Sequence, residues 1–180
     1  KAGVQLTKQL TSLQHAAQAC RLSIIEMHAA AQSAHLGSSL SVVDILVTLY
    51  HGMLDVDLIK QQRLDRDYVI SSKGHAASAL YATLASVGVI PNSMLAGYYR
   101  GLLAGLLTRA PKLGIEASTG SLGHGLPIAV GLALAAKHDN RRSHVYVIVG
   151  DGECQEGTTW EALVMAARFK LNNLTIIVDD

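Results

Sequence analysis

The sequence predicts an α/β fold built on a doubly wound, mostly parallel sheet that is flanked by helices. Two apolar runs rich in β-branched residues, HVYVIV (144–149) and LTIIVDD (174–180), support this prediction, and one helical segment separates them. Such runs are typical of strands covered on both faces, and a strand, helix, strand unit joins parallel strands by a right-handed crossover. With 180 residues, 49% of them hydrophobic, the chain can form the core of one domain.

The first quarter of the chain is predicted to be helical. Apolar residues recur at helical spacing over residues 4–32, without Pro or Gly, which predicts a long amphipathic helix. The segment SAHLGSSLS (33–41) breaks this pattern, and Ser41 is expected to cap a second helix that runs to about Tyr50. His35 is therefore expected in a loop between two helices.

A strand and a helix are predicted next, joined by a short turn. RDYVISS (66–72) has the pattern of a strand, and KGHAASALYATLASVG (73–88) that of a helix, which Gly88 is expected to end. His75 then lies in the turn between them. Residues 92–115 have weak periodicity and are expected to be mostly loop.

The glycine-rich segment GSLGHG (120–125) is expected to open a further helix. That helix, LPIAVGLALAAKH (126–138), consists almost wholly of small and aliphatic residues, so we expect it to be buried on most sides. After the next strand, Thr158 with Glu161 is expected to form a capping box at the start of a helix that runs to about Lys170.

Composition excludes several classes of function. Lys and Arg number 15 against 14 Asp and Glu, and no run of like charges could follow a phosphate backbone, so no nucleic-acid partner is expected. The apolar stretch LPIAVGLALAA (126–136) is shorter than the roughly 20 residues that span a bilayer, so no membrane segment is expected. Cys20 and Cys154 lack any motif spacing, which favours a reducing, cytoplasmic location.

The segment GDGECQEG (150–157) follows the strand predicted over HVYVIV, and ligands of parallel sheets bind at the carboxyl ends of strands. Gly150 and Gly152 would let backbone amides approach phosphate oxygens, and Asp151 offers a hard carboxylate for Mg²⁺ or Ca²⁺. The residues fit a tight turn with Asp151 as a helix cap equally well. Neither a complete GxGxxG pattern nor a Walker A lysine is present, which weakens a dinucleotide or P-loop interpretation. The diphosphate site and the tight turn both stay open.

Four motifs, taken in order, resemble those of the transketolase family. GDGECQEGTTWEALVMAARFKLNNLTIIVDD is similar to the thiamine diphosphate signature in its transketolase form, where an Asn follows the second strand. SAHLGSSLSVVDIL and SKGHAASALYATLASVG resemble the family's two histidine loops, and IEASTGSLGHGLPIAVGLALA its glycine-rich cofactor loop. The alpha subunits of 2-oxo acid dehydrogenases would share GDG but not the histidine loops. The resemblance implies the diphosphate-binding domain of the thiamine-diphosphate-binding fold.

The resemblance also implies roles for single residues. His35 matches a histidine above the thiazolium that assists proton transfers, His75 a histidine near the diphosphate, and Glu156 an acid in a carboxylate network at the dimer interface. Asp151 matches the metal ligand and Gly152 the backbone contact beside it. The residues implied in cofactor binding are His75, Gly120, Leu122, Asp151, Gly152 and Glu153.

Each of these residues also has a structural interpretation. A loop histidine is usually exposed or bonded to backbone, Gly120 and Leu122 fit a turn and a core position, and Glu156 fits a surface acid near a helix start. The role of His124 stays open, and Cys154 is expected to pack rather than react. The histidines without motif support, expected to be structural or exposed, are His15, His28, His51, His138 and His144.

Two departures from the family pattern bear on the substrate and the metal. Transketolases usually carry a Gly-His-Pro segment before the glycine-rich loop, and alignment back from Ile115 places Leu106 at its histidine. An apolar side chain cannot hydrogen-bond a ketose hydroxyl, so a donor that is less hydroxylated or differently oriented is one expectation, and a loop shifted by a few residues is the other. The Asn of the signature would come directly after Asp180, so the second metal ligand is expected there.

The resemblance implies only one of the two domains that the family needs for catalysis. The family joins a diphosphate-binding domain to a pyrimidine-binding domain, and only the first fits in 180 residues. Residues 1–180 are therefore expected to be a single diphosphate-binding domain whose C-terminal part lies beyond Asp180. We expect an N-terminal subunit of a split transketolase, or a fragment of a longer one, with thiamine diphosphate and Mg²⁺ or Ca²⁺. With a pyrimidine-domain partner, in a hetero-oligomer built on a dimer, it would transfer a two-carbon ketol unit from a ketose or ketose phosphate to an aldehyde.

Two alternatives remain. Another thiamine diphosphate carboligase, with a less hydroxylated or α-keto acid donor, is favoured by Leu106 and disfavoured by the histidine loops. A non-catalytic cofactor-binding or scaffolding subunit would be favoured if no Asn followed Asp180. The sequence names neither the donor nor the acceptor.

Overall fold

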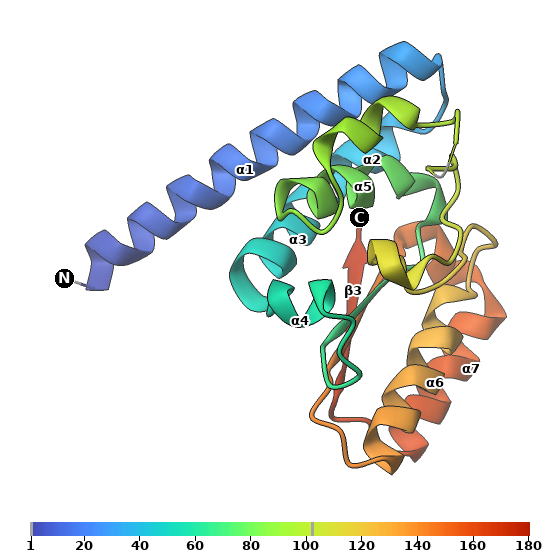
Figure 1. Ribbon diagram of the computed structural model, residues 1–180. Helices are drawn as coiled ribbons and strands as arrows, with labels where there is room; N and C mark the ends of the chain where they lie inside the picture. The colour runs from blue at the N-terminus through green and yellow to red at the C-terminus, as the bar shows by residue number, and fades with distance from the viewer. Residues whose placement is uncertain (1, 102) are drawn as a thin grey trace. The chain divides into compact units, whose positions relative to one another are not determined.

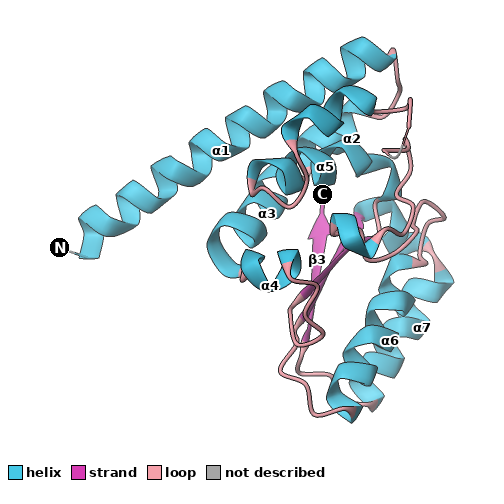
Figure 2. Ribbon diagram, viewed as in Figure 1, coloured by secondary structure: helices cyan, strands magenta, loops and turns pink. Residues whose placement is uncertain are grey.

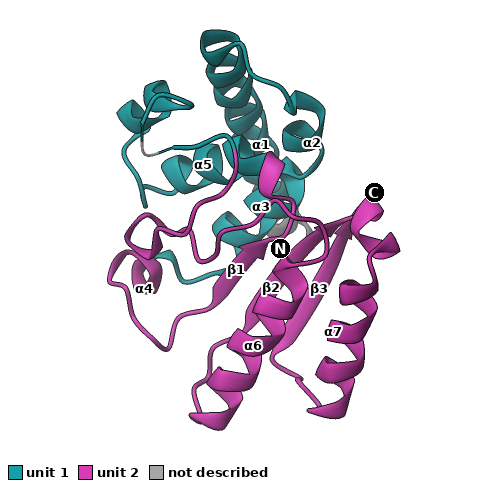
Figure 3. Cartoon of the chain, turned by 90° about the vertical axis from the view of Figure 1, so that its right-hand side faces the viewer, with its two compact units in different colours: residues 1–56, 76–105 teal, residues 57–75, 106–180 magenta. Residues whose placement is uncertain are grey.

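The computed structural model describes residues 2–101 and 103–180, with side chains from residue 7 onward (Figures 1 and 2). The chain forms two compact units, which Figure 3 shows in different colours. The first unit comprises Lys1–Val56 and Ala76–Gly105, and the second Asp57–His75 and Leu106–Asp180. Each unit is described by itself, and the single domain expected over residues 1–180 stays a prediction.

The first unit is helical, and its longest helix is α1 (Ala2–Ala31), which confirms the long helix predicted from residue 4. The buried apolar residues of the described part of α1 follow one another at spacings of three and four, as an amphipathic helix requires: Ala17, Cys20, Ile24 and Met27. Leu22 and Ile25 fit the apolar pattern but are exposed. The buried stripe of α1 packs against α3 and α5.

The second predicted helix is broken into three segments: α2 (Leu36–Ser41), α3 (Val43–Thr48) and a π-helical turn (Leu49–Met53). Ser41 does not cap a helix, because its hydroxyl donates to the Ser38 carbonyl one turn back. By length and hydropathy alone, residues 36–53 could cross a membrane, but 39% of this stretch is buried inside the fold. A helix that is buried in a protein core meets the same criterion of length and hydropathy.

The helix α5 (Ala77–Ser86) forms the centre of the first unit. Every residue from Ala77 to Ala85 is buried, and a single 3₁₀ turn (Gly74–Ala76) precedes the helix. Gly88 has a φ of 71°, which a glycine adopts without strain, and the Val89 N–H closes the helix end on the Leu84 carbonyl. Residues 92–115 are mostly loop, as predicted, with 3₁₀ turns at Asn92–Gly97 and Pro111–Leu113.

The second unit is built on a sheet of three parallel strands in the order β1 (Tyr68–Ser71), β2 (Val145–Gly150) and β3 (Leu174–Asp179). The three strands coincide with the predicted ones, so the α/β class and the parallel sheet are confirmed. The short helix α4 (Val56–Lys60) precedes β1. The helix α6 (Gly125–His138) lies along the sheet, and α7 (Gly157–Arg168) packs beside it (Figure 3).

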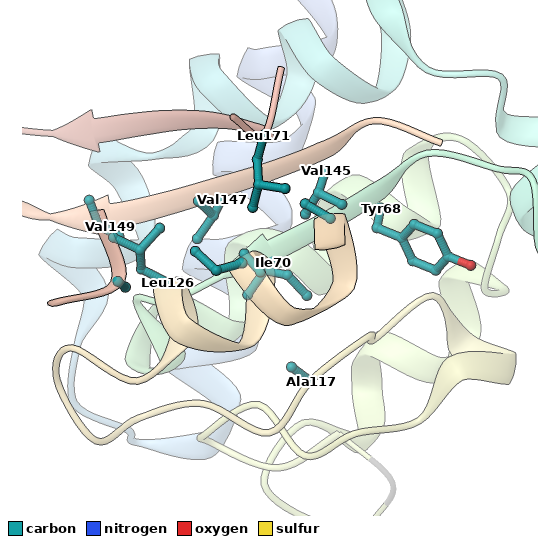
Figure 4. Close-up of a cluster of buried hydrophobic side chains, with 12 residues drawn as sticks. Tyr68, Ile70, Ala117, Leu126, Val145, Val147, Val149 and Leu171 are labelled. Carbon is teal, nitrogen blue, oxygen red and sulfur yellow. The ribbon is translucent and has the colours of Figure 1, made fainter. Parts of the chain in front are cut away.

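The core of this unit lies between the sheet and α6 (Figure 4). Leu126 of α6 is fully buried against side chains from β1 and β2, among them Ile70, Val147 and Val149. Alternate residues of a strand point to opposite faces, and Ile148 is also fully buried, so β2 is covered on both sides as expected. The packed core fixes the ends of β1 and β2, where the candidate site lies.

Three local predictions for this unit are wrong. The outward face of α6 is exposed at Pro127, Ile128, Gly131 and Ala135, because only one face of the helix meets the sheet. In the described sheet β3 pairs with β2 alone, so residues 174–177 are half-buried and Val178 is 49% exposed, although Asp179 is buried. No capping box forms at α7, because the Thr158 hydroxyl donates to the Gly123 carbonyl instead.

Candidate cofactor site at the carboxyl ends of the strands

Three loops of the second unit meet at the carboxyl ends of β1 and β2. They are residues 72–75 after β1, residues 119–125 before α6, and residues 151–156 after β2. The third loop forms a 3₁₀ turn, Asp151–Gln155. The position is the one at which parallel sheets bind ligands, because the loops diverge there and leave backbone groups accessible.

Glu153 joins the three loops from a buried position, with only 1% of its surface exposed. Its Oε1 accepts hydrogen bonds from the Ser72 hydroxyl (2.5 Å) and the Gly123 N–H (2.9 Å). Its Oε2 accepts the Gly150 N–H at 2.9 Å. All three neighbours donate, and an ionised carboxylate is the side chain that can accept at both oxygens. Glu153 therefore holds the loop backbone, and both of its carboxylate oxygens are engaged within the protein.

The glycine-rich loop also packs directly on the end of β1. A Cβ added to Gly74 would lie 2.3 Å from the carbonyl carbon of Thr119, so no larger residue fits there. The Thr119 hydroxyl donates to the Ser71 carbonyl at 2.7 Å, and the Gly125 N–H donates to the Ser72 hydroxyl at 3.1 Å. These contacts fix the backbone on both sides of the glycine-rich turn.

A buried ion pair links the ends of β1 and β3. The Lys73 ammonium donates to the Asp179 carboxylate, and their side chains are only 12% and 7% exposed. The aliphatic part of Lys73 borders Gly150, where an added Cβ would lie 3.5 Å from the Lys73 Cγ. A positive charge and a carboxylate thus stand beside the GDG turn.

Asp151 and Gly152 are exposed at the tip of this turn. A Cβ added to Gly152 would meet nothing within 4 Å, so the backbone there is open to a ligand. Among the described residues, no group of three His, Cys, Asp or Glu side chains could hold a metal ion. Asp151 offers one carboxylate to a hard cation, whose other ligands would be oxygens such as backbone carbonyls, water or a phosphate.

Gly120, Leu122 and Leu106 lie at the rim of the site. Gly120 has a φ of 145°, and a Cβ at Gly120 would lie 3.3 Å from the Leu106 Cδ2. Both leucines are partly exposed, 39% for Leu122 and 49% for Leu106. The segment that carries Leu106 is fixed, because the Leu107 backbone bonds to both Gly74 and Thr119. An apolar side chain therefore stands over the glycine-rich loop.

Glu156 precedes α7 and is exposed. A Cβ added to Gly123 would lie 2.7 Å from the Glu156 Cβ, and Gly123 has a φ of 77°, so this close approach requires glycine. Glu156 makes no side-chain cap of α7. The Glu156 Cγ lies 3.2 Å from the same added Cβ, so the exposed side chain begins beside the glycine-rich loop.

The two motif histidines belong to different units. His75 is half-buried in the turn after β1 and directly follows Gly74, which touches the glycine-rich loop. His35 lies in the first unit, exposed, immediately before α2. The second unit thus brings together all the residues predicted for the site except His35: His75, Gly120, Leu122, Asp151, Gly152, Glu153 and Glu156.

Ser72, Lys73 and Thr119 shape the site but were not predicted from the sequence. Ser72 bonds to a residue 81 positions away and Thr119 to one 48 positions away. Pairs this far apart leave no periodic signal in a single sequence. The one available signal was the position of Ser72 and Lys73 directly before the GH pair of the second histidine loop.

The second unit also has a cavity outside these three loops. It has a volume of about 640 Å³ and is lined by Arg66, Tyr68 and Glu116, among others. Arg66 and Glu116 neutralise one another across 2.9 Å, with both side chains buried. No residue of the three loops lines this cavity, and we do not assign the cofactor to it.

The chain is similar to several transketolase sequences. It is 43% identical over 170 residues to one subunit of the apulose-4-phosphate transketolase of Actinobacillus succinogenes, covering 93% of this chain and 62% of that protein. It is 36% identical over 176 residues to the 6-deoxy-6-sulfo-D-fructose transketolase subunit SqwG of Clostridium sp., covering 97% of this chain and 64% of that protein. The chain thus spans less than two thirds of the length of these relatives.

Solved structures and a family model agree with these sequences. The fold is similar to the transketolase from Leishmania mexicana, with a TM-score of 0.80 and 26% identity, covering 92% of this chain and 27% of that one. Residues 12–180 match the model of the family "Transketolase, thiamine diphosphate binding domain". The chain belongs to the transketolase family and carries its thiamine diphosphate binding domain.

Proposed function

We propose that this chain is the N-terminal subunit of a split transketolase, which binds thiamine diphosphate and Mg²⁺ (or Ca²⁺) and transfers a two-carbon ketol unit from a ketose or its phosphate to an aldehyde. The observation that carries the proposal is the Glu153 cluster, which holds the GDG turn and the glycine-rich loop together at the carboxyl ends of β1 and β2. The names of two relatives, each a transketolase subunit, support the same assignment.

The residues at this edge fit a diphosphate with its metal ion. Gly152 leaves open space at the backbone, and the exposed Asp151 offers a carboxylate oxygen, the ligand type that Mg²⁺ prefers. Gly120 and Leu122 would hold the cofactor by backbone and apolar contact, and His75 would bond the diphosphate. Thiamine diphosphate, once bound, supplies the carbanion chemistry of the transfer. Glu153 acts by positioning the loops that bind it.

His35 is proposed to move a proton to or from the substrate, and Glu156 to join a carboxylate network with a second protomer. An imidazole suits the first role, because its ordinary pKa lies near neutral pH. Glu156 suits the second, because it is exposed beside the glycine-rich loop.

The proposed partner is a C-terminal subunit with the pyrimidine-binding domain, in a hetero-oligomer built on a dimer. The helix α7, which begins directly after Glu156, supports an interface here. Its outward side carries the exposed apolar residues Trp160 (59%), Val164 (68%) and Met165 (46%). An apolar patch of this kind marks a surface that binds another protein. We propose that the assembly works in the cytoplasm.

The experiment that tests the function is reconstitution. The full-length chain and its partner are purified separately, then mixed with thiamine diphosphate, Mg²⁺ and an aldehyde acceptor, and product is measured for ketose phosphates, ketoses and α-keto acids as donors. We expect ketol transfer from a ketose or ketose phosphate in the mixture and none from either protein by itself. Transfer from an α-keto acid only would favour another carboligase, and cofactor binding without any turnover would favour a non-catalytic subunit.

Leu106 bears on the choice of donor. Its place beside Gly120 supports the alignment that puts it where the family usually has a histidine, rather than a shifted loop. An apolar side chain offers no hydrogen bond to a donor hydroxyl, so a less hydroxylated donor is the finer proposal.

Changing Leu106 tests this directly. Leu106→His is expected to raise the ratio of kcat/KM for a ketose phosphate over that for a donor with fewer hydroxyls by about tenfold, the value of one good hydrogen bond. Leu106→Met, which keeps an apolar side chain of similar volume, should leave the ratio unchanged. Equal ratios in all three proteins would show that residue 106 does not contact the donor.

A further inference from the structure

A buried polar cluster lies in the helical unit and is used by none of the roles above. His28, near the end of α1, is only 5% exposed, and Ser39 of α2 and Ser78 of α5 are fully buried. Buried polar side chains are retained in a core only when they are hydrogen-bonded, and each of these three is bonded. The cluster therefore has a defined geometry.

The hydrogen bonds run in one direction from His28 to the backbone of His35. The Ser78 hydroxyl donates to the Ser39 hydroxyl at 2.8 Å, and the Ser39 hydroxyl donates to the His35 carbonyl at 3.2 Å. Since each hydroxyl has one proton, the His28 Nε2, 2.9 Å from the Ser78 oxygen, must be the donor in that pair. This arrangement places the ring proton of His28 on Nε2.

The other ring nitrogen of His28 reaches the start of the same loop. With the proton on Nε2, Nδ1 accepts from the Ser33 hydroxyl at 3.0 Å, and the Ser33 carbonyl oxygen lies farther from the same nitrogen, at 3.4 Å. The ring of Tyr98 packs on the imidazole, with centroids 5.4 Å apart. Burial raises the pKa of Tyr98, although hydrogen bonds with Ser33 and Ser78 lower it in part. One imidazole thus connects both ends of the loop that carries His35.

This loop holds His35 in an unusual conformation. His35 has a φ of 71°, in the left-handed region that residues other than glycine seldom adopt. Its carbonyl accepts the Ser38 hydroxyl at 3.0 Å and the Ser39 N–H at 3.3 Å, besides the Ser39 hydroxyl. Such a conformation persists only where the surroundings fix it. The bonds from α2 and the serine chain from His28 supply that restraint.

We propose that His28 is a positioning residue: its imidazole, through Ser33 on one side and Ser78 and Ser39 on the other, fixes residues 33–39 and so aims the side chain of His35. The proposal rests on the catalytic role proposed for His35. A histidine suits the position, because its ring has a donor and an acceptor on opposite edges, and no aliphatic residue can bridge the two serines.

A double-mutant cycle in the assembled enzyme tests the proposal. His28→Leu is expected to lower kcat about tenfold, because a misplaced catalytic group loses orientation. In a His35→Ala background the same change should lower kcat less than twofold, because the group that it positions is gone. His28→Gln, which can keep the bond to Ser78, should recover part of the loss. His15→Leu, an exposed position on the same helix, is the matched control.

Hydrogen exchange of backbone amides separates positioning from catalysis. In His28→Leu, and equally in Ser78→Ala, residues 33–39 should exchange at least tenfold faster than in the control, while α5 stays protected. The proposal is overturned if exchange in the loop is unchanged, or if His28→Leu costs the same factor in kcat with and without His35. If His35→Ala alone leaves kcat unchanged, the proposed role of His35 fails, and faster loop exchange still supports the positioning by His28.

Discussion

Glu153→Ala is expected to lower the free energy of unfolding by about 3 kcal/mol and to abolish cofactor binding, because three buried donors lose their common acceptor. Those donors come from the end of β1, the glycine-rich loop and the end of β2. An alanine leaves the Ser72 hydroxyl and two backbone N–H groups without a partner inside the protein. The loops of the candidate site then lose their mutual alignment.

Glu153→Gln gives the sharper comparison. A side-chain amide can still accept from Ser72 and Gly123 with its oxygen, but its NH₂ group would face the Gly150 N–H, where a second acceptor is needed. We expect Glu153→Gln to lower the free energy of unfolding by about half as much as Glu153→Ala does. Chemical denaturation measures both, with Glu161→Gln, an exposed acid on α7, as the control that should change stability by no more than about 0.5 kcal/mol. Equal stability of the wild type and Glu153→Ala would refute the assigned role.

The strands and the long helices could be predicted from the sequence, because their signals are local. The continuous β-branched runs predicted β2 and β3, and the apolar spacing predicted α1. The end of α5 near Gly88 could be predicted in the same way. These features depend on residues within a few positions of one another.

Two of the wrong predictions concern a hydroxyl group that donates to an acceptor other than the expected one. Thr158 has the spacing of a capping box with Glu161, but its hydroxyl meets the Gly123 carbonyl, 35 positions away in the chain. Ser41 was predicted to cap a helix, but it is the last residue of α2, and its hydroxyl donates to the Ser38 carbonyl within that helix. A local rule cannot reveal which of two acceptors a hydroxyl will meet in the fold.

The candidate site could be located from the sequence but not assembled. The motifs identified Asp151 and the glycines, and a resemblance supplied the roles. How the loops are held became visible only in the structure, where Glu153 turned out to bond Ser72 rather than lie open to a ligand. His28 had no motif at all, and its importance follows from burial and bonding alone.

Asp151→Ala is expected to weaken the binding of thiamine diphosphate with Mg²⁺ by about 100-fold or more, since loss of even an outer partner of a metal site costs 10–100-fold. Asp151 is exposed and bears no hydrogen bond that stabilises the described fold, so the free energy of unfolding should change by less than about 0.5 kcal/mol. Asp151→Asn keeps an oxygen ligand but removes its charge. Its affinity for thiamine diphosphate with Mg²⁺ should therefore lie between those of the wild type and Asp151→Ala.

The central claim is that Asp151 binds the metal ion that accompanies thiamine diphosphate. Isothermal titration of the full-length chain, combined with its partner subunit, tests this claim most directly. Thiamine diphosphate is titrated with and without Mg²⁺ into the wild type, Asp151→Ala and the control Glu161→Ala. We predict Mg²⁺-dependent binding in the wild type and the control, and no measurable heat in Asp151→Ala at concentrations that saturate the wild type. Binding of equal affinity in Asp151→Ala would contradict the metal site, and an absence of binding in the wild type would contradict the cofactor itself.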